Sequence, residues 1–231
     1  MPSKRYKKAL EVLDARKAYS LKEAVGVLAK FPKAKFNETV DLAFRLGVDP
    51  KQSDQMIRGT VPLPHGSGKT VRVLVFARSG AGADAAKAAG AEYVGFEDMI
   101  KKCNDGWSDF DVAIATPEAM IEVRKLGKVL GPRGLMPNPK TGTVTDDTAR
   151  AVKEVKAGRV EFKIDKAGNV HVPVGKVSFA PNQIEENARA VIEAVAKARP
   201  HSVKGTYIHS CTISATMSPP VRVDVREFSN N

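Results

Sequence analysis

Apolar and polar residues alternate over one stretch near the start of this 231-residue chain, between Asn37 and Val48. A period of two predicts a strand with one buried face and one open face. A second strand is predicted over Ile57–Val61, and the prolines at 62 and 64 oppose its continuation inside a sheet. The first strand presents Val40, Leu42, Phe44 and Leu46 on its apolar face and Thr39, Asp41, Ala43 and Arg45 on its open face.

Helical spacing precedes these strands. A basic helix is predicted over about Lys7–Lys17, and Ser20 stands where the cap of a second helix is expected. The first stretch, up to about His65, is therefore predicted to mix helices with half-buried strands. The apolar face of the second helix comprises Leu21, Ala24, Val25, Leu28 and Phe31.

The middle of the chain follows a different pattern. Val71–Ala77 is almost continuously apolar, which is typical of a strand covered on both faces. Strands and helices then alternate, and this order predicts a parallel α/β sheet. The further predicted strands are Ala91–Val94 and Val112–Ala115, and the predicted helices are Ala83–Ala89, a short one near Met99, one opened by Thr116 and Pro117, and one from Thr145–Asp147 to Gly158.

The last stretch returns to antiparallel strands. Because the first and last stretches share this character, we expect them to pair into one discontinuous domain, with the middle inserted between hinges near residues 64–69 and 156–159. The predicted elements are a β-hairpin of Arg159–Ile164 and Val170–Val174, a helix over Asn182–Lys197, and strands over Thr206–Thr216 and Val221–Val225.

The net charge of +11 and the isoelectric point near 9.6 favour a polyanionic partner, either nucleic acid or an anionic membrane surface. Simple solubility is the alternative interpretation. Residues 1–35 contain ten Lys or Arg and three acidic residues, whereas residues 67–159 contain fifteen basic and twelve acidic residues. The excess of positive charge is therefore concentrated near the start of the chain. The aromatic content of 6% opposes a surface that stacks many bases.

Several classes of protein are not expected. The chain has no apolar run of about 18 or more residues, and its basic start lacks the apolar stretch of a signal peptide. Cys103 and Cys211 lie far apart and favour a reducing compartment, so we expect a cytoplasmic protein with no membrane partner. The spacing of the histidines does not fit a zinc site, so no metal is expected. The sequence also brings together no set of nucleophile, base and acid, and no cofactor is expected.

One glycine-rich loop raises an enzymatic alternative. Gly80 and Gly82 fit a G-x-G-x-x-G/A pattern between a strand and a helix, which can hold a pyrophosphate, and Glu97 and Asp98 lie at about the spacing of a ribose contact. Glycines that merely allow a turn explain the same residues. His65–Thr70 resembles the end of a phosphate-binding loop, but Leu63 stands where that pattern needs glycine, so the segment is interpreted as a hinge.

Three further segments are candidates for nucleic-acid contact. Lys125–Gly142 is predicted to be a long loop that contains the basic residues Lys128, Arg133 and Lys140. Two functional interpretations of these residues are contact with nucleic acid and contact with another domain, and the alternative is a rigid connector with solvated charges. Lys35 and Phe36 can contact a phosphate and a sugar or base, or Phe36 covers the edge of the core. The threonines of Thr212–Met217 can meet RNA 2′-hydroxyl groups or water.

Long segments of this chain resemble the bacterial ribosomal protein L-one family, the stalk proteins of the large ribosomal subunit. The resemblance covers essentially the whole chain, and Leu130–Lys140 is its most specific segment. The other matching segments are Lys35–Val40, Leu46–Pro50, Arg58–Val61, Leu63–Gly66, Gly175–Phe179 and Thr216–Met217.

The resemblance implies a mixed α/β architecture. A discontinuous two-layer α+β domain of residues 1–66 and 159–231 would carry an inserted Rossmann-like three-layer parallel α/β domain, residues 67–158, that binds no dinucleotide. It also implies a non-enzymatic protein of the large ribosomal subunit in the cytoplasm, monomeric when free. The implied partners are large-subunit ribosomal RNA at the mobile stalk, the exit-site tRNA that the family helps to move and release, and the messenger of its own operon, whose translation it can repress.

The resemblance also implies the RNA-contacting residues. The family usually has glycine where this chain has Ser218, and a glycine permits close backbone approach to RNA. A second departure from the family pattern lies around Ser79–Gly82. The implied contacts are Lys35, Phe36, Glu38 and Thr39 at a strand entrance, Lys163, Asp165 and Lys166 in the predicted hairpin, and Ser210, Thr216, Met217 and Ser218 on the late strand.

Overall fold

The computed structural model describes residues 3–78 and 80–228, and the chain divides into two compact units. The first unit combines the chain up to Gly68 with the chain from Val160 onward, and the second unit is Lys69–Arg159. An antiparallel sheet lies in the first unit and a parallel sheet in the second. The predicted fold class, a discontinuous α+β domain with an inserted parallel α/β domain, is confirmed.

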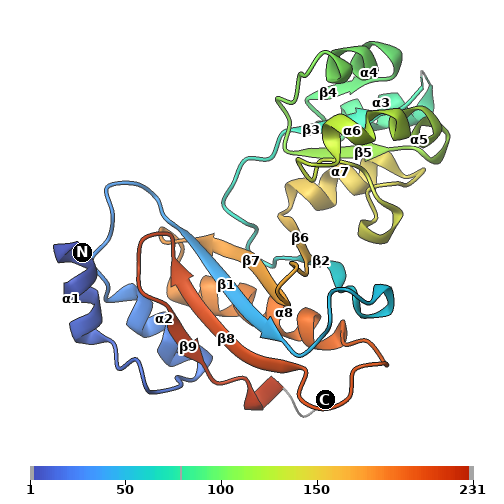
Figure 1. Ribbon diagram of the computed structural model, residues 1–231. Coiled ribbons are helices and arrows are strands. Elements are labelled where there is room, and N and C mark those ends of the chain that lie inside the picture. Colours follow the sequence, from blue (N-terminus) through green and yellow to red (C-terminus); the bar gives the residue numbers. More distant parts are fainter. Residues whose placement is uncertain (1–2, 79, 229–231) are drawn as a thin grey trace. The chain divides into compact units, whose positions relative to one another are not determined.

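A four-stranded antiparallel sheet forms the centre of the first unit, with the strand order β7-β1-β8-β9. In Figure 1, β1 from the N-terminal part of the chain lies between β7 and β8 from the C-terminal part. The sheet therefore requires both ends of the chain. Its strands are β1 (Thr39–Leu46), β7 (Asn169–Lys176), β8 (Ile208–Ala215) and β9 (Val221–Val223).

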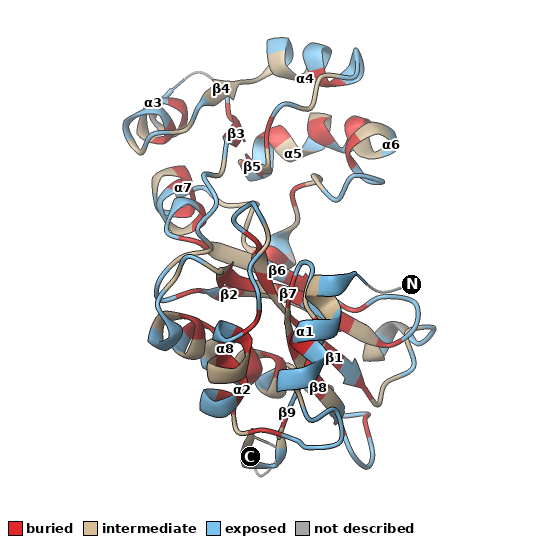
Figure 2. Ribbon diagram, turned by 90° about the vertical axis from the view of Figure 1, so that its left-hand side faces the viewer, coloured by how far each residue is buried: buried red, intermediate tan, exposed pale blue. Residues whose placement is uncertain are grey.

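Two helices cover one face of this sheet, α2 (Leu21–Ala29) and α8 (Pro181–Lys197). Ser20 begins α2 with a capping box, because its hydroxyl accepts from the Glu23 N–H and the Glu23 carboxylate accepts from the Ser20 N–H. Figure 2 shows buried and exposed stretches on both helices, as expected where one side meets a sheet and the other meets solvent. The opposite face of the sheet stays open, and its β1 residues are only partly buried or exposed.

Three parallel strands in the order β4-β3-β5 form the second unit. Leu74 and Phe76 of β3 join one core with α4, α5 and α6, whereas Val73 and Val75 join another with α3 and α7. The sheet is thus covered on both faces, as the continuous apolar run predicted. The elements are β3 (Val73–Phe76), β4 (Tyr93–Gly95), β5 (Val112–Ala115), α3 (Ala81–Ala88), α4 (Glu97–Asn104), α5 (Pro117–Val123), α6 (Gly127–Leu130) and α7 (Thr148–Lys156).

The remaining elements are short. Pro62 ends β2, which has a neighbouring strand on one side only, and such an edge strand tolerates proline. Among the described residues, no helix combines the length and the apolar composition needed to cross a bilayer. The short elements are α1 (Lys4–Val12), the paired strands β2 (Arg58–Pro62) and β6 (Arg159–Lys163), and the 3-10 turns η1 (Ser53–Gln55), η2 (Arg124–Leu126), η3 (Pro139–Thr141) and η4 (Arg226–Phe228).

Three predicted elements were wrong in detail. The first helix covers Lys4–Val12, not Lys7–Lys17, because the Ser3 hydroxyl accepts from the Tyr6 N–H and starts it earlier. The predicted β-hairpin does not form, because β6 pairs with β2 and β7 pairs with β1. The bridge between Ile164 and Val170 joins the adjacent ends of β6 and β7. The predicted loop Lys125–Gly142 begins as η2 and α6, which bury leucines in the core.

Candidate nucleic-acid interface

Glu38 connects three segments of the first unit immediately before β1. Its side chain is only 4% exposed, and its Oε1 atom accepts hydrogen bonds from the Ala34 N–H at 2.6 Å and from Arg5 Nη1 at 3.4 Å. Its Oε2 atom accepts from the Met217 N–H at 3.0 Å. One buried carboxylate therefore holds α1, the segment before β1 and the turn after β8 together, and its oxygens are satisfied by these donors.

Thr39 and Thr216 extend the pairing of β1 and β8 beyond the end of β8. The Thr39 N–H donates to Thr216 Oγ1 at 3.0 Å, and the Thr216 N–H donates to the Thr39 carbonyl oxygen at 3.0 Å. Lys176 of β7 donates from Nζ to Thr39 Oγ1 at 2.7 Å. Two hydroxyl groups and one positive charge are thus fixed at this end of the sheet.

Two large apolar side chains are exposed beside this network. Phe36 and Met217 each have an exposed fraction of 54%. Glu38 accepts from the Met217 N–H, and its bond from the Ala34 N–H closes the segment 34–38 that carries Phe36, so one carboxylate restrains the backbone of both. Lys35 is exposed next to Phe36. This end of the sheet therefore presents apolar and basic groups together from an ordered backbone.

Ser218 occupies the position at which the resembling family usually has glycine. Its Oγ atom accepts from the Ala215 N–H at 2.9 Å and lies 3.1 Å from the Pro219 carbonyl oxygen, to which it can donate. Every described residue with a positive φ is a glycine, so the backbone at Ser218 does not need one. The serine side chain bonds its own turn, which leaves the adjacent Met217 as the exposed side chain.

The strand register divides the predicted site residues into two groups. Thr39 pairs with Lys176, whereas Arg45 pairs with Asn169 on one side and with Ser210 on the other. Arg45 lies six positions after Thr39, and a strand rises about 3.4 Å per residue, so the two groups lie roughly 20 Å apart. The first group is at the Glu38 end of β1, and the second group, with Ser210, is at the other end.

The turn between β6 and β7 belongs to the second group. Asp165 Oδ1 accepts from the Ala167 and Asn169 N–H groups, each at 2.8 Å, and the hydrogen bond from Asn169 is the main reason that the pKa of Asp165 is lowered. Lys163 and Lys166 are exposed on either side of Asp165. Asp165 therefore shapes the turn that presents the two lysines.

Polar side chains lie between the two groups on the face of the sheet opposite α2 and α8. Asp41 stands opposite Ser214 of β8 and Pro173 of β7, and it is half-buried. Burial raises the pKa of Asp41, while the charges of His171 and Lys176 oppose this rise. We call this surface the open face; it comprises Thr39, Asp41, Ala43, Arg45, His171, Pro173, Lys176, Ser210, Thr212 and Ser214.

The basic residues predicted in the second unit are not part of this face. Arg133 donates from Nη1 to the Ser108 hydroxyl group of its own unit, and Lys128 is exposed on α6. Leu135 and Met136 pack against the core beside them, so the segment is held in place as their apolar character predicted. The side chain of Lys140 lies outside the described residues.

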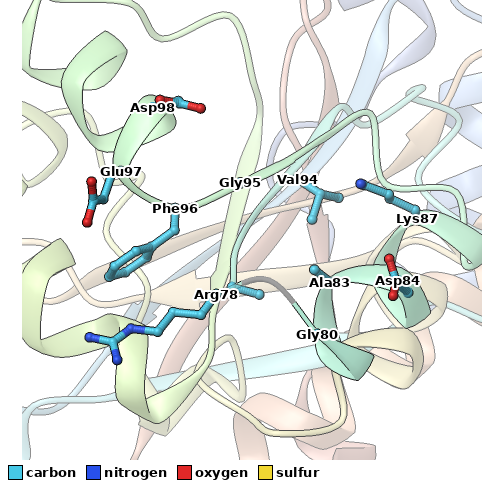
Figure 3. Close-up of a pocket in the computed structure, with 11 residues that line it drawn as sticks. Arg78, Gly80, Ala83, Asp84, Lys87, Val94, Gly95, Phe96, Glu97 and Asp98 are labelled. Atoms are coloured by element: carbon cyan, nitrogen blue, oxygen red, sulfur yellow. The ribbon is translucent and has the colours of Figure 1, made fainter.

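The glycine loop of the second unit adjoins a cavity of about 610 Å³. Figure 3 shows Arg78 beside Phe96, whose ring centre is 5.1 Å from the guanidinium carbon. Gly80 has a φ of 143°, a value that side-chain-bearing residues rarely adopt, so the turn into α3 explains this glycine without a ligand. Ser79, where the chain departs from the family pattern, lies outside the described residues. The charged side chains that line the cavity are mixed in sign: Arg78, Lys87, Asp84, Glu97 and Asp98.

Several polar residues at this interface have no role that the sequence pattern predicts. The alternation of β1 placed Asp41 and Arg45 on an open surface but did not indicate what lies opposite them. His171 and Lys176 join the face through strand register, and Arg5 joins it through a contact with a residue 33 positions away. No local pattern signals a contact of that kind.

Comparison with known proteins shows the family of this chain. The model of the Ribosomal protein L1p/L10e family matches residues 28–219, which include both groups of predicted site residues. The chain belongs to this family. The "Large ribosomal subunit protein uL1" of Protochlamydia amoebophila (strain UWE25) is 53% identical over 226 residues, which cover 98% of this chain and 95% of that protein. Membership of the L1p/L10e family confirms the resemblance and the expectation of a ribosomal protein that is not an enzyme, and the enzymatic alternative through Gly80 and Gly82 is rejected.

Proposed function

We propose that the open face and the residues at its two ends bind a folded segment of large-subunit ribosomal RNA at the mobile stalk. The observation that carries this proposal is the Glu38 network, which holds Phe36 and Met217 exposed beside the hydroxyl groups of Thr39 and Thr216. Exposed apolar side chains on an ordered, polar and basic surface are typical of an interface.

Three kinds of contact follow from the chemistry of the face. Lys35, Lys163 and Lys166 neutralise phosphates and supply a salt-dependent affinity that does not depend on sequence. Hydroxyl groups such as those of Ser210 and Thr216 meet the 2′-hydroxyl groups and base edges of a wide RNA minor groove. Phe36 and Met217 contact sugars or bases and exclude water. These two stand beside Thr39, Ser218 and the positioning carboxylate Glu38, whereas Asp165 shapes the turn that carries Lys163 and Lys166 at the other end of the face.

The distance between the two groups favours recognition of shape. Groups roughly 20 Å apart, on a strand rising about 3.4 Å per residue, contact parts of an RNA that are separated by a similar distance. A stem with an adjoining loop or bulge holds such parts at a fixed separation before binding, whereas a flexible single strand must be ordered on the surface at an entropic cost. The face therefore distinguishes one folded RNA from another by contour.

The same proposal includes two further RNA partners. A messenger of the protein's own operon that folds to the same contour would compete with ribosomal RNA for the open face, and its translation would be repressed when the protein is in excess. On the ribosome, the protein would assist the movement and release of exit-site tRNA. Lys128, Arg133 and Lys140 of the second unit are proposed as a weaker secondary contact.

Alanine substitution of the two exposed apolar residues tests the proposal. Phe36→Ala and Met217→Ala are each expected to weaken binding of a stalk RNA fragment by about 1–3 kcal/mol, as for lost base or sugar contacts. Met56→Ala is the matched control, because Met56 has the same exposed fraction of 54% but lies outside the open face. Fluorescence anisotropy with labelled RNA measures the change. Unchanged affinity in both variants would defeat the assignment.

A further inference from the structure

Asp41 places a negative charge at the centre of a surface proposed to meet a polyanion. It lies between the two groups of site residues, opposite Ser214 and Pro173. Within residues 3–78 and 80–228, its carboxylate takes part in no hydrogen bond or ion pair, although His171 and Lys176 are close enough to act on its charge. The described part of the chain therefore leaves both carboxylate oxygens of Asp41 free to accept.

The chemistry of a carboxylate limits what it can bind. An ionised carboxylate has acceptors and no donor, and the phosphate oxygens of RNA are acceptors of the same sign, so the two repel each other. The donors that an RNA presents at a wide minor groove are its 2′-hydroxyl groups and the 2-amino group of guanine. The hydroxyl groups of Ser214 and Thr212 can both donate and accept, and so discriminate less strongly between donor and acceptor partners.

Resting on the RNA-binding function proposed above, we propose that Asp41 is a specificity-determining residue that accepts a hydrogen bond from one RNA donor. The donor is a 2′-hydroxyl group or a guanine 2-amino group placed over the middle of the open face. A correctly folded RNA presents that donor when both ends of the face are occupied. An RNA of different contour presents a phosphate or no partner, and the desolvated carboxylate then opposes binding.

Two effects of opposite sign distinguish this role from simple repulsion. Removing a negative charge from a cationic face strengthens the binding of any RNA, because fewer phosphates are repelled. Removing an acceptor that a specific donor uses weakens the binding of that RNA alone. Asp41→Ala is therefore expected to lower the affinity for the stalk fragment by about 10- to 100-fold, the range for a hydrogen bond to a charged group. Its affinity for an unrelated duplex is expected to stay unchanged or to rise.

The experiment uses the full-length protein and two RNAs of equal length, a stalk fragment and an unrelated duplex, at one salt concentration. Asp41→Asn keeps the shape of the side chain and is expected to lose less specific affinity than Asp41→Ala. Glu193→Gln is the charge-matched control, because Glu193 is exposed on α8, which covers the opposite face. Tighter binding of both RNAs by Asp41→Ala overturns the inference, as does an equal loss on both. A wild-type protein that does not distinguish the RNAs instead overturns the proposed function.

Modified RNA identifies the donor. Replacing individual guanosines by inosine removes the 2-amino group, and single 2′-deoxy substitutions remove one hydroxyl group. If Asp41 accepts from one of these groups, one modification weakens wild-type binding but has no further effect on Asp41→Ala. Modifications that weaken both proteins equally at every position contradict the inference.

Discussion

Glu38→Gln is the most informative substitution at this interface, because it changes a charge and a hydrogen-bonding pattern but almost no volume. The carboxylate accepts from the Ala34 N–H and Arg5 through one oxygen and from the Met217 N–H through the other. A glutamine amide offers one oxygen and one NH₂ group. Whichever way it turns, the NH₂ group faces a backbone N–H that also donates, and one of the two N–H groups loses its acceptor.

The magnitude follows from that geometry. A buried donor left without a partner costs about 1–3 kcal/mol, and the hydrogen bond that survives changes from charged to neutral at a further cost of about 1 kcal/mol. The expected loss of unfolding free energy is therefore roughly 2–4 kcal/mol. The weakened contact joins α1, the segment before β1 and the turn after β8, so the loss also releases Phe36 and Met217.

RNA affinity gives the decisive sign. By charge alone, removing an acid from a basic surface strengthens RNA binding. If Glu38 positions the contact residues, Glu38→Gln instead weakens binding of the stalk fragment. Urea unfolding measures the stability, hydrogen exchange measures protection of the Met217 N–H, and anisotropy measures the affinity. Glu11→Gln is the matched control, because Glu11 is exposed on α1.

The result that refutes this reasoning is specific. If Glu38→Gln unfolds at the wild-type urea concentration and binds the stalk fragment as tightly as the wild type or more tightly, Glu38 does not position the interface. A loss of stability with unchanged RNA affinity would separate the two roles. It would show that the segments carrying Phe36 and Met217 keep their places without this carboxylate.

Two further predictions concern charge. Lys166→Ala is expected to reduce the slope of log affinity against log salt by about 1, the effect of losing one phosphate contact, whereas Lys101→Ala on α4 leaves the slope unchanged. In the second unit, the hydrogen bond from Lys69 at 2.5 Å lowers the pKa of Asp111 to about 2. The ionised Asp111 therefore stabilises the fold above about pH 4, and this effect is lost as the pH falls through 2. Asp111→Asn should lower the free energy of unfolding at pH 7 by up to about 2 kcal/mol. The difference in unfolding free energy between the variant and the wild type should shrink towards pH 2. A gap in urea midpoint that stays constant with pH would contradict the second prediction.

Local chemistry explains which elements the sequence predicts well. The hydroxyl groups of Ser20 and Thr116 start α2 and α5 where expected, because an N-cap needs only an acceptor within three residues of a free N–H. The run Val71–Ala77 predicts the doubly covered strand β3, because each face of a parallel sheet in this fold packs on helices. In each case the deciding interaction lies within the element or on its surface.

Elements that depend on distant partners are predicted less well. Lys125–Gly142 contains many glycines and prolines and was predicted to be a loop, yet Leu126 and Leu130 are fully buried in the core of the second unit. Tertiary burial overrides the weak helix propensity of Gly127. The ends of β6 and β7 resemble a hairpin in sequence, but each strand finds its partner in a different sheet.

The candidate interface shows the same limit at the level of single residues. The sequence identifies Thr39, Asp41 and Arg45 as one face of a strand, but only the register with β7 and β8 shows that Ser210 belongs with Arg45 and not with Thr39. A shift of one residue would turn every side chain of β1 to the other face, so register decides which residues reach an RNA. The burial of Glu38 depends on Arg5, Ala34 and Met217 together, which no spacing rule connects.

The roles proposed for the two carboxylates near this face combine affinity for RNA with selectivity among RNAs. A net charge of +11 attracts any RNA, so cationic residues alone distinguish poorly between a stalk and another stem. Glu38 adds selectivity indirectly, because its donors are all within the chain and it fixes where Phe36 and Met217 stand. Asp41 adds it directly, because its oxygens have no partner among the described residues and repel every RNA that offers them no donor. Loss of the Glu38 carboxylate should weaken binding of every folded RNA that contacts Phe36 and Met217. Loss of the Asp41 carboxylate should weaken binding only of the RNA that presents a donor to it.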